Sequence, residues 1–453
     1  MVSIKTYIPF YKRNLKVALP IVFSQVGGAV VQLVDTFMVG HLGTVELAAV
    51  SFASAVFAIG YVFSIGILLG ATPIIGQAYV RQEKQTIVEL FQNSILLATV
   101  AAIFIGSLLY LTSFFMDNMG QVDAVVELAI PYFLVLVVSL IPNMYFFAIK
   151  QFLEGLGNTK VAMWITIISN LINILLNYLL IFGKYGFPEL GVLGAGIATL
   201  IARVSMPLIY LLWLRLKPEW WSYCKSFQWS LFSWVRLKQL LAMGLPIAAH
   251  ILLEVTAFAF SGVMIGWLGA APLAAHQIAN NMSNLAFMVV MGIASATTIR
   301  VSHQLGARNI EALKMAAMAS VHLCLFANAI MATLLIVFRL QIAQAFSSDP
   351  AVISIASQVL VMAGIFQLAD GMQAVGAGIL RGLTDVKVGM LYAFIAYICI
   401  NLPLGYVLGF VCGFGAVGVW AAFIFGLGTA AILFHLRYYK VRKRIFAELQ
   451  EVV

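Results

Sequence analysis

Charged residues are scarce in this chain, and several familiar motifs are missing from it. Only 9% of its 453 residues are charged while 63% are hydrophobic, a balance that excludes a water-soluble globular protein. Neither GxxxxGKS nor GxxxxGKT occurs, so a P-loop does not supply energy from ATP. HExxH and GxSxG are absent as well. We therefore expect a membrane protein that is not an enzyme.

Cysteine is also rare, and its spacing carries no pattern. The four cysteines form no CxxC pair and no paired loop arrangement, so neither a disulfide framework nor a zinc site is predicted. They are Cys224, Cys324, Cys399 and Cys412. We interpret them as apolar packing residues and predict no bound cofactor.

Long apolar runs fill most of the chain. Each of twelve runs can cross a hydrocarbon core of roughly 30 Å with some tilt, whereas a barrel strand would alternate over about 10 residues. They cover residues 15–40, 46–75, 88–115, 123–149, 160–183, 191–214, 240–267, 273–299, 312–338, 351–378, 387–411 and 414–436. Because a lone segment in lipid must satisfy its own backbone hydrogen bonds, we predict an all-α membrane protein with twelve transmembrane helices.

The basic residues indicate how these helices are oriented. If the N-terminus is cytoplasmic, nearly all of the 26 lysines and arginines fall in cytoplasmic segments, as the positive-inside rule requires. The outer loops keep only Lys184 and Arg339, and Arg203 lies inside a span. We expect a multi-pass protein of the cell (inner) membrane with both termini cytoplasmic. The net charge of +9 then needs no nucleic-acid partner.

The chain also repeats itself. Sliding it by 226 residues aligns 19–21 with 245–247, and a series of glycine, threonine and aspartate positions follows in the same order. Each half holds six spans, so the repeats point the same way and are related by a pseudo-twofold axis along the membrane normal, with the substrate path between them. We predict an N-terminal lobe (1–214), a cytoplasmic linker (215–238) and a C-terminal lobe (239–453).

Three carboxylates lie inside spans: Asp35, Glu254 and Asp370. An ionised group at the centre of a membrane helix costs roughly 2.5 to 3.5 kcal/mol on insertion scales, so such residues are functional candidates. The alternative is that they are protonated or hydrogen-bonded structural residues. Glu254 and Asp370 reach similar depths and would repel each other unless a proton or a Na⁺ ion is bound there. Release of that cation when a cationic substrate arrives is the chemistry of an antiporter.

Polar amides lie at matching depths on other spans. Asn173 and Asn177 are four residues apart, share one helix face and can meet Asp35, which suits a proton relay or a Na⁺ site. Amides that merely join helices are the alternative. Gln277 and Asn281 share a face of span eight that we expect to look toward a cavity or toward Glu254.

Three segments together resemble the multidrug and toxic compound extrusion (MATE) family, and its NorM-like branch in particular. They are VDTFMVGHLG at 34–43, AAHQIA at 274–279 and RGLTD at 381–385. The resemblance extends from about residue 10 to 440. It implies a twelve-helix exporter that works by alternating access and exchanges Na⁺ or H⁺ for organic cations.

The resemblance also implies roles for particular residues. Asp35 matches the family's acid in span one, with Asn173, Asn177 and Thr199 as its partners. Glu254 and Asp370 match the acids of spans seven and ten. We therefore expect a secondary active multidrug exporter, monomeric in the bilayer, whose substrates are cationic amphipathic compounds.

The alternative is a flippase for lipid-linked precursors. A flippase would need a cavity rich in arginine and lysine to hold pyrophosphate, yet Arg203 is the single basic residue placed inside a span. Carboxylates and amides serve Na⁺ and H⁺ equally, so the coupling ion stays open. The acids do not follow the repeat, because Asp35 aligns with Ser261 and Glu254 with Gly28. The two lobes thus share a scaffold but differ in chemistry.

Overall fold

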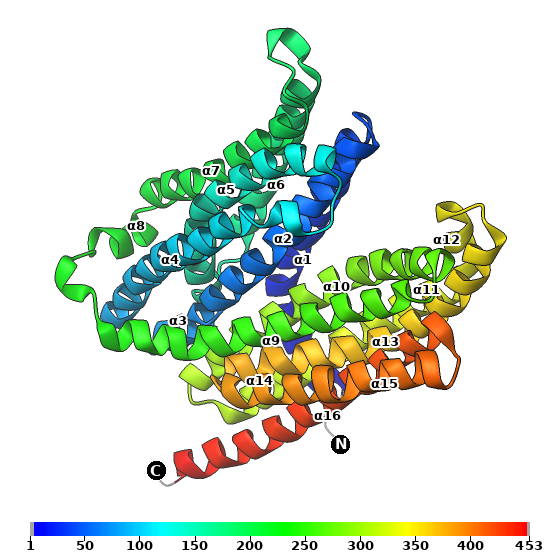
Figure 1. Ribbon diagram of the computed structural model, residues 1–453. Helices are drawn as coiled ribbons and strands as arrows, with labels where there is room; N and C mark the ends of the chain where they lie inside the picture. Colours follow the sequence, from blue (N-terminus) through cyan, green and yellow to red (C-terminus); the bar gives the residue numbers. More distant parts are fainter. Residues whose placement is uncertain (1–3, 451–453) are drawn as a thin grey trace. The chain divides into compact units, whose positions relative to one another are not determined.

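The computed structural model describes residues 4–450, apart from the side chains of Trp229, Leu449 and Gln450. Within these residues the chain is helical almost throughout and contains no β-strand (Figure 1). Twelve helices in this described part are long and apolar enough to cross a membrane, and each of the twelve predicted runs either lies within one of them or extends one or two residues past its end. The predicted fold class is thereby confirmed.

The chain divides into two compact units, each described here by itself. The N-terminal unit is Val26–Ala248, and the C-terminal unit is Ala249–Val453 together with Met1–Gln25. These units differ from the division predicted by chain order (1–214, 215–238, 239–453). The chain before Val26 belongs with the C-terminal unit, and the chain up to Ala248 belongs with the N-terminal unit.

The helices of the N-terminal unit follow one another in chain order. They are the second part of α1 (Ile4–Gly40), α2 (Thr44–Leu69), α3 (Ala71–Val80), α4 (Lys84–Ser113), η1 (Met116–Asn118), α5 (Asp123–Gly155), α6 (Lys160–Phe182), η2 (Lys184–Gly186), α7 (Gly191–Leu216), α8 (Pro218–Lys225), η3 (Trp229–Leu231) and the first part of α9 (Trp234–Gly266).

The C-terminal unit contains the remaining helices. They are the first part of α1, the second part of α9, α10 (Ala270–Gly306), α11 (Ile310–Val337), α12 (Arg339–Phe346), α13 (Pro350–Gly382), α14 (Val386–Phe394), η4 (Ile395–Asn401), α15 (Leu402–Tyr406), η5 (Val407–Val411) and α16 (Gly415–Gln450). Of these, η4 and η5 are π-helical, and α15 between them carries Pro403, which lacks the backbone N–H that would extend a regular ladder.

Two helices therefore begin in one unit and end in the other. In the N-terminal unit, Gly66 of α2 faces Ala248 of α9 so closely that a methyl group would collide with it. In the C-terminal unit, Gly292 of α10 faces Val22 of α1 in the same way. The members of the second contact lie 226 residues from those of the first, so the sequence repeat is a repeat of packing.

A buried hydrogen bond repeats in the same manner. Thr72 Oγ1 donates to the carbonyl oxygen of Gln151 at 3.2 Å, and Thr298 Oγ1 donates to that of Gly378 at 3.0 Å. Each bond ties the second helix of a repeat to its fourth. The two threonines, at equivalent positions of the repeat, thus make equivalent hydrogen bonds within their own units.

These close contacts predict where an added methyl group will be harmful. We expect Gly66→Ala and Gly292→Ala each to cost about 1–3 kcal/mol, because overpacking forces the neighbouring backbone to move. Gly428→Ala is the matched control, since a Cβ there meets nothing within 4 Å. The apparent melting temperature of the detergent-solubilised protein measures both effects. Equal melting temperatures for all three variants would contradict this account of the packing.

The predicted linker is folded against the N-terminal unit. Gln92 and Asn93 of α4 bind its backbone, with Gln92 Nε2 donating to the carbonyl oxygen of Gln228 at 2.6 Å. Arg236 forms an ion pair with Glu89 at 2.9 Å. Burial raises the pKa of the Cys224 thiol to about 11, so this thiol stays protonated and unreactive near neutral pH.

Candidate functional site

A chain of polar side chains connects three helices of the N-terminal unit. Asn177 Nδ2 on α6 donates to Asp35 Oδ1 on α1 at 2.5 Å and lies 3.1 Å from Asn173 Oδ1. Asn173 Nδ2 donates to Thr199 Oγ1 on α7 at 3.4 Å, and that hydroxyl donates to the carbonyl oxygen of Ala195. The structure thus brings together all four residues predicted for this site.

The local helical geometry explains why these residues meet. Asn173 and Asn177 are one turn apart, so both face the same neighbours. Asn177 is fully buried and Asn173 is 5% exposed, whereas Asp35 is half-buried. Asn177 Oδ1 is buried without a hydrogen-bond partner in the described part of the chain. A buried oxygen acceptor beside a carboxylate provides the oxygen ligands that a hard cation prefers.

Arg203 lies one turn beyond Thr199 on α7. Its Nη1 donates to Ser139 Oγ on α5 at 2.7 Å. Its guanidinium carbon lies over the rings of Phe57 and Tyr61 on α2, 5.3 and 5.1 Å from their centroids. The sequence could not name these partners, because serine and aromatic residues are common in every span.

The C-terminal unit holds the second carboxylate cluster. Asp370 on α13 is 2% exposed, and its Oδ1 has no hydrogen-bond partner among the described residues. Glu254 on α9 is half-buried and interacts electrostatically with Asp370. Gln373 and His250 join the same two helices through a contact of 3.2 Å. Each of these residues lies about one turn from one of the two acids, so their contact places Glu254 and Asp370 at the same level of α9 and α13.

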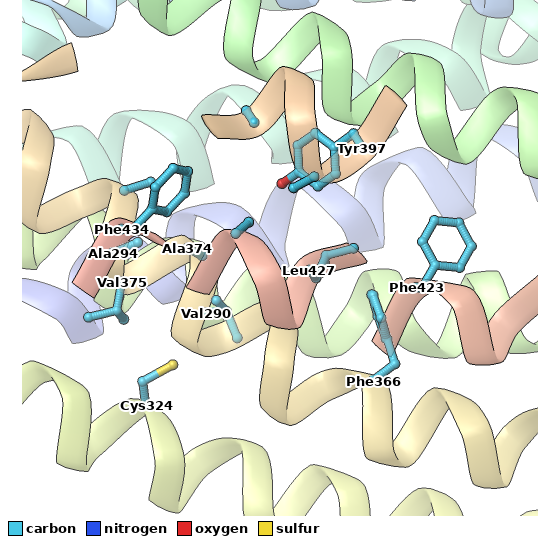
Figure 2. Packing of buried hydrophobic residues seen from close by; sticks show 14 of the residues in the cluster. Val290, Ala294, Cys324, Phe366, Ala374, Val375, Tyr397, Phe423, Leu427 and Phe434 are labelled. Atoms are coloured by element: carbon cyan, nitrogen blue, oxygen red, sulfur yellow. The ribbon is translucent and has the colours of Figure 1, made fainter. Parts of the chain in front are cut away.

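Tyr397 of η4 is a member of this cluster that the sequence did not reveal. It is fully buried, its hydroxyl has no partner in the described part of the chain, and it interacts electrostatically with both Glu254 and Asp370. Figure 2 shows this hydroxyl among the buried residues of α13 and α16. Arg381 contributes a positive charge that also acts on Glu254. Two carboxylates, one phenol and one guanidinium thus share a largely apolar interior.

Gln277 and Asn281 of α10 lie elsewhere in the C-terminal unit. Gln277 Nε2 donates to Asn281 Oδ1 at 3.1 Å, and both side chains are exposed. Exposed amides within a membrane helix are compatible with water but costly against lipid. Within residues 4–450, neither side chain forms a hydrogen bond with Glu254 or Asp370. They form one polar face of α10 and are not part of the carboxylate cluster.

Neither cluster has the composition of a transition-metal site. Across residues 4–450, no three His, Cys, Asp or Glu side chains converge in the way that such a metal requires. What each cluster offers is one or two carboxylates with neutral oxygen atoms nearby. That donor set can take up a proton or an alkali-metal cation.

Comparison with known proteins agrees with this architecture. The model of the MatE family matches residues 20–179 and again 246–407, so one pattern covers both halves of the repeat. Multidrug resistance protein MdtK of Photorhabdus laumondii is 32% identical over 436 residues, which are 95% of each chain. The probable multidrug resistance protein NorM of Rhizobium meliloti is 30% identical over 442 residues, 96% of this chain and 95% of the relative.

Solved structures share the fold at lower identity. The bent form of the Vibrio cholerae MATE transporter VcmN superposes with a TM-score of 0.88 at 20% identity, covering 97% of this chain and 99% of that one. The eukaryotic MATE transporter AtDTX14 gives 0.85 at 20% identity, with the same coverage. At these identities the superpositions establish the fold alone.

Proposed function

Because the chain belongs to the MatE family, the multidrug and toxic compound extrusion transporters, we propose that it is a secondary active multidrug exporter. In this proposal it exchanges Na⁺ or H⁺ for cationic amphipathic organic compounds by alternating access. Its relatives MdtK and NorM, named as multidrug resistance proteins, support this activity. The proposal includes residence in the inner membrane, both termini in the cytoplasm and a monomeric state.

The observation that carries the proposal is the Asp35 network of the N-terminal unit. The Asp35 carboxylate, which accepts a hydrogen bond from Asn177, lies in a membrane helix, where an ionised side chain is energetically unfavourable unless a cation neutralises it. Binding of one cation neutralises it, and loss of that cation restores a negative site that an organic cation can approach. Competition between two cations for one carboxylate makes their binding mutually exclusive, which is the requirement for exchange.

The C-terminal unit supports the same chemistry through a pair of acids. Two carboxylates in an apolar interior repel each other, so the pair favours one shared cation or proton. Asp370 Oδ1 and the Tyr397 hydroxyl, both buried without partners in the described chain, are available to such a cation. We propose this cluster as a second cation site and Gln277 and Asn281 as polar contacts for the substrate.

An ion gradient supplies enough energy for this task. A tenfold gradient of the coupling ion provides about 1.4 kcal/mol, which in one-for-one exchange sustains roughly a tenfold concentration difference of the organic cation. The structure provides no added support for the flippase alternative, which needs basic side chains that are free to bind pyrophosphate. Arg203, the basic residue at the interior site of the N-terminal unit, is already occupied by Ser139 and two aromatic rings.

Transport in reconstituted vesicles tests the proposal. Vesicles carrying the purified protein and a fluorescent organic cation would receive a Na⁺ gradient, a pH gradient or neither, with protein-free vesicles as the control. We expect one of the two gradients to drive accumulation of the organic cation, and an ionophore that dissipates that gradient to stop it. If neither the Na⁺ gradient nor the pH gradient drove accumulation of the organic cation, the proposed antiport would be overturned.

A further inference from the structure

Arg203 is a charged residue of the membrane interior that the exchange mechanism does not use. It lies within the span Gly191–Leu216, and no carboxylate is within ion-pair distance of it among the described residues. A cation without an acidic partner is unfavourable in this environment. Its presence in the N-terminal unit therefore suggests a function that a neutral side chain would not perform.

The guanidinium is held firmly in place. Ser139, which accepts its hydrogen bond at 2.7 Å, is fully buried and donates its own hydroxyl to the carbonyl oxygen of Leu136 at 2.6 Å. The rings of Phe57 and Tyr61 lie against each other with centroids 5.4 Å apart and present their faces to the cation. A cation over two aromatic faces is stabilised without being neutralised. Its positive charge therefore persists in the interior.

This fixed charge lies close to the Asp35 network. Thr199, the last residue of that network, is one helical turn from Arg203 on α7. Arg203 and Asp35 interact electrostatically, and the buried phenol of Tyr132 interacts with both. Any cation that binds Asp35 must therefore enter a region where a positive charge is already present.

We propose that Arg203 is a fixed internal cation that weakens the binding of the coupling cation at Asp35, so that this cation can leave within each transport cycle. The inference rests on the proposed function, because it assumes that Asp35 binds the coupling cation. In a medium of effective dielectric constant about 20, repulsion from a nearby unit charge lowers the affinity for a second cation on the order of tenfold. Without Arg203 the site would bind more tightly and release more slowly.

A purely structural role for Arg203 predicts a different result. If the side chain only joins α7 to α2 and α5, its removal lowers stability and leaves the affinity of Asp35 for cations unchanged. If its charge acts on Asp35, the affinity of Asp35 for cations rises when the charge is removed and is unchanged when the charge is kept. Arg203→Met removes the charge at similar volume, whereas Arg203→Lys keeps it.

Competition binding separates the two roles. Ethidium, a fluorescent organic cation, would be bound to detergent-solubilised protein and displaced by Na⁺ at fixed pH, or by acid in the absence of Na⁺. Its concentration would be kept well below its dissociation constant for every variant, so that the midpoint of displacement reports the affinity for Na⁺ or H⁺ alone. We expect the concentration of Na⁺ or H⁺ that displaces half of the ethidium to be about tenfold lower for Arg203→Met than for wild type. For Arg203→Lys this concentration should agree with the wild-type value within about twofold. Arg203→Gln replaces Arg203→Met if the latter does not give a monodisperse protein.

Two controls assign the effect. In an Asp35→Asn background, the Arg203 substitutions should no longer change displacement, and Lys184→Met, which removes a basic residue of the η2 turn, should match wild type. Unchanged or weaker displacement in the charge-free Arg203 variant would overturn the inference while leaving the proposed function intact. If neither Na⁺ nor acid displaced ethidium from wild type, the proposed function would fail and this inference with it.

Discussion

Asp35→Asn is expected to lower gradient-driven export of an organic cation at least tenfold. The asparagine keeps the size of the side chain and can still bond to Asn177, but it cannot carry the negative charge for which two cations would compete. Initial rates of export from vesicles measure the effect. Asp123→Asn is the matched control, since Asp123 is exposed at the start of α5.

An Asp35→Asn variant that exports at the wild-type rate would contradict the role given to this carboxylate. A loss of export in Asp123→Asn as well would indicate damage to the fold, which the elution profile of the solubilised protein detects. The specific outcome is therefore a protein that elutes as the wild type does but no longer exports the organic cation in response to the imposed gradient.

Glu254→Gln and Asp370→Asn are expected to produce the second large effect, each lowering export about tenfold or more. If the two acids share one cation, losing either carboxylate removes the site, so the double variant should be no worse than the single ones. Residues that act as one unit depart from additivity in this way. Rates for the two single variants and the double variant, measured under one gradient, complete the cycle.

The matched control for Glu254→Gln is Glu311→Gln, because Glu311 is exposed in the first turn of α11. Multiplied losses in the double variant would mean that Glu254 and Asp370 act independently. Wild-type rates in both single variants would remove the second cation site from the mechanism and leave the Asp35 network as the one coupling site.

The sequence allowed the spans and the Asp35 network to be predicted, for clear physical reasons. Length and hydropathy suffice to identify a membrane helix, because lipid leaves few alternatives to it. The spacing of one turn between Asn173 and Asn177 predicts that they lie on the same face of a helix. The ends of the helices were less accessible. The first predicted run begins at residue 15, whereas α1 begins at Ile4, because a helix can continue beyond the hydrocarbon core with polar residues.

Contacts between side chains that are distant in the sequence could not be predicted from it. The chain holds 32 phenylalanines and 16 tyrosines, so nothing in the sequence singles out Phe57 and Tyr61 as neighbours of Arg203. Tyr397 lies in a π-helical segment, for which the usual period of 3.6 residues does not predict the face on which a side chain lies. The division of α1 and α9 between units follows the packing of the helices, which composition does not reveal.

Exchange itself is the central claim, and driving the protein in reverse tests it most directly. A steep gradient of organic cation would be imposed across vesicles that begin with equal Na⁺ and equal pH on both sides, and both ions would be followed by fluorescent indicators. We expect Na⁺ or H⁺ to move against the direction of the organic cation in wild type and to stay at equilibrium in Asp35→Asn. Organic-cation movement without ion movement, or both moving in the same direction, would contradict the account.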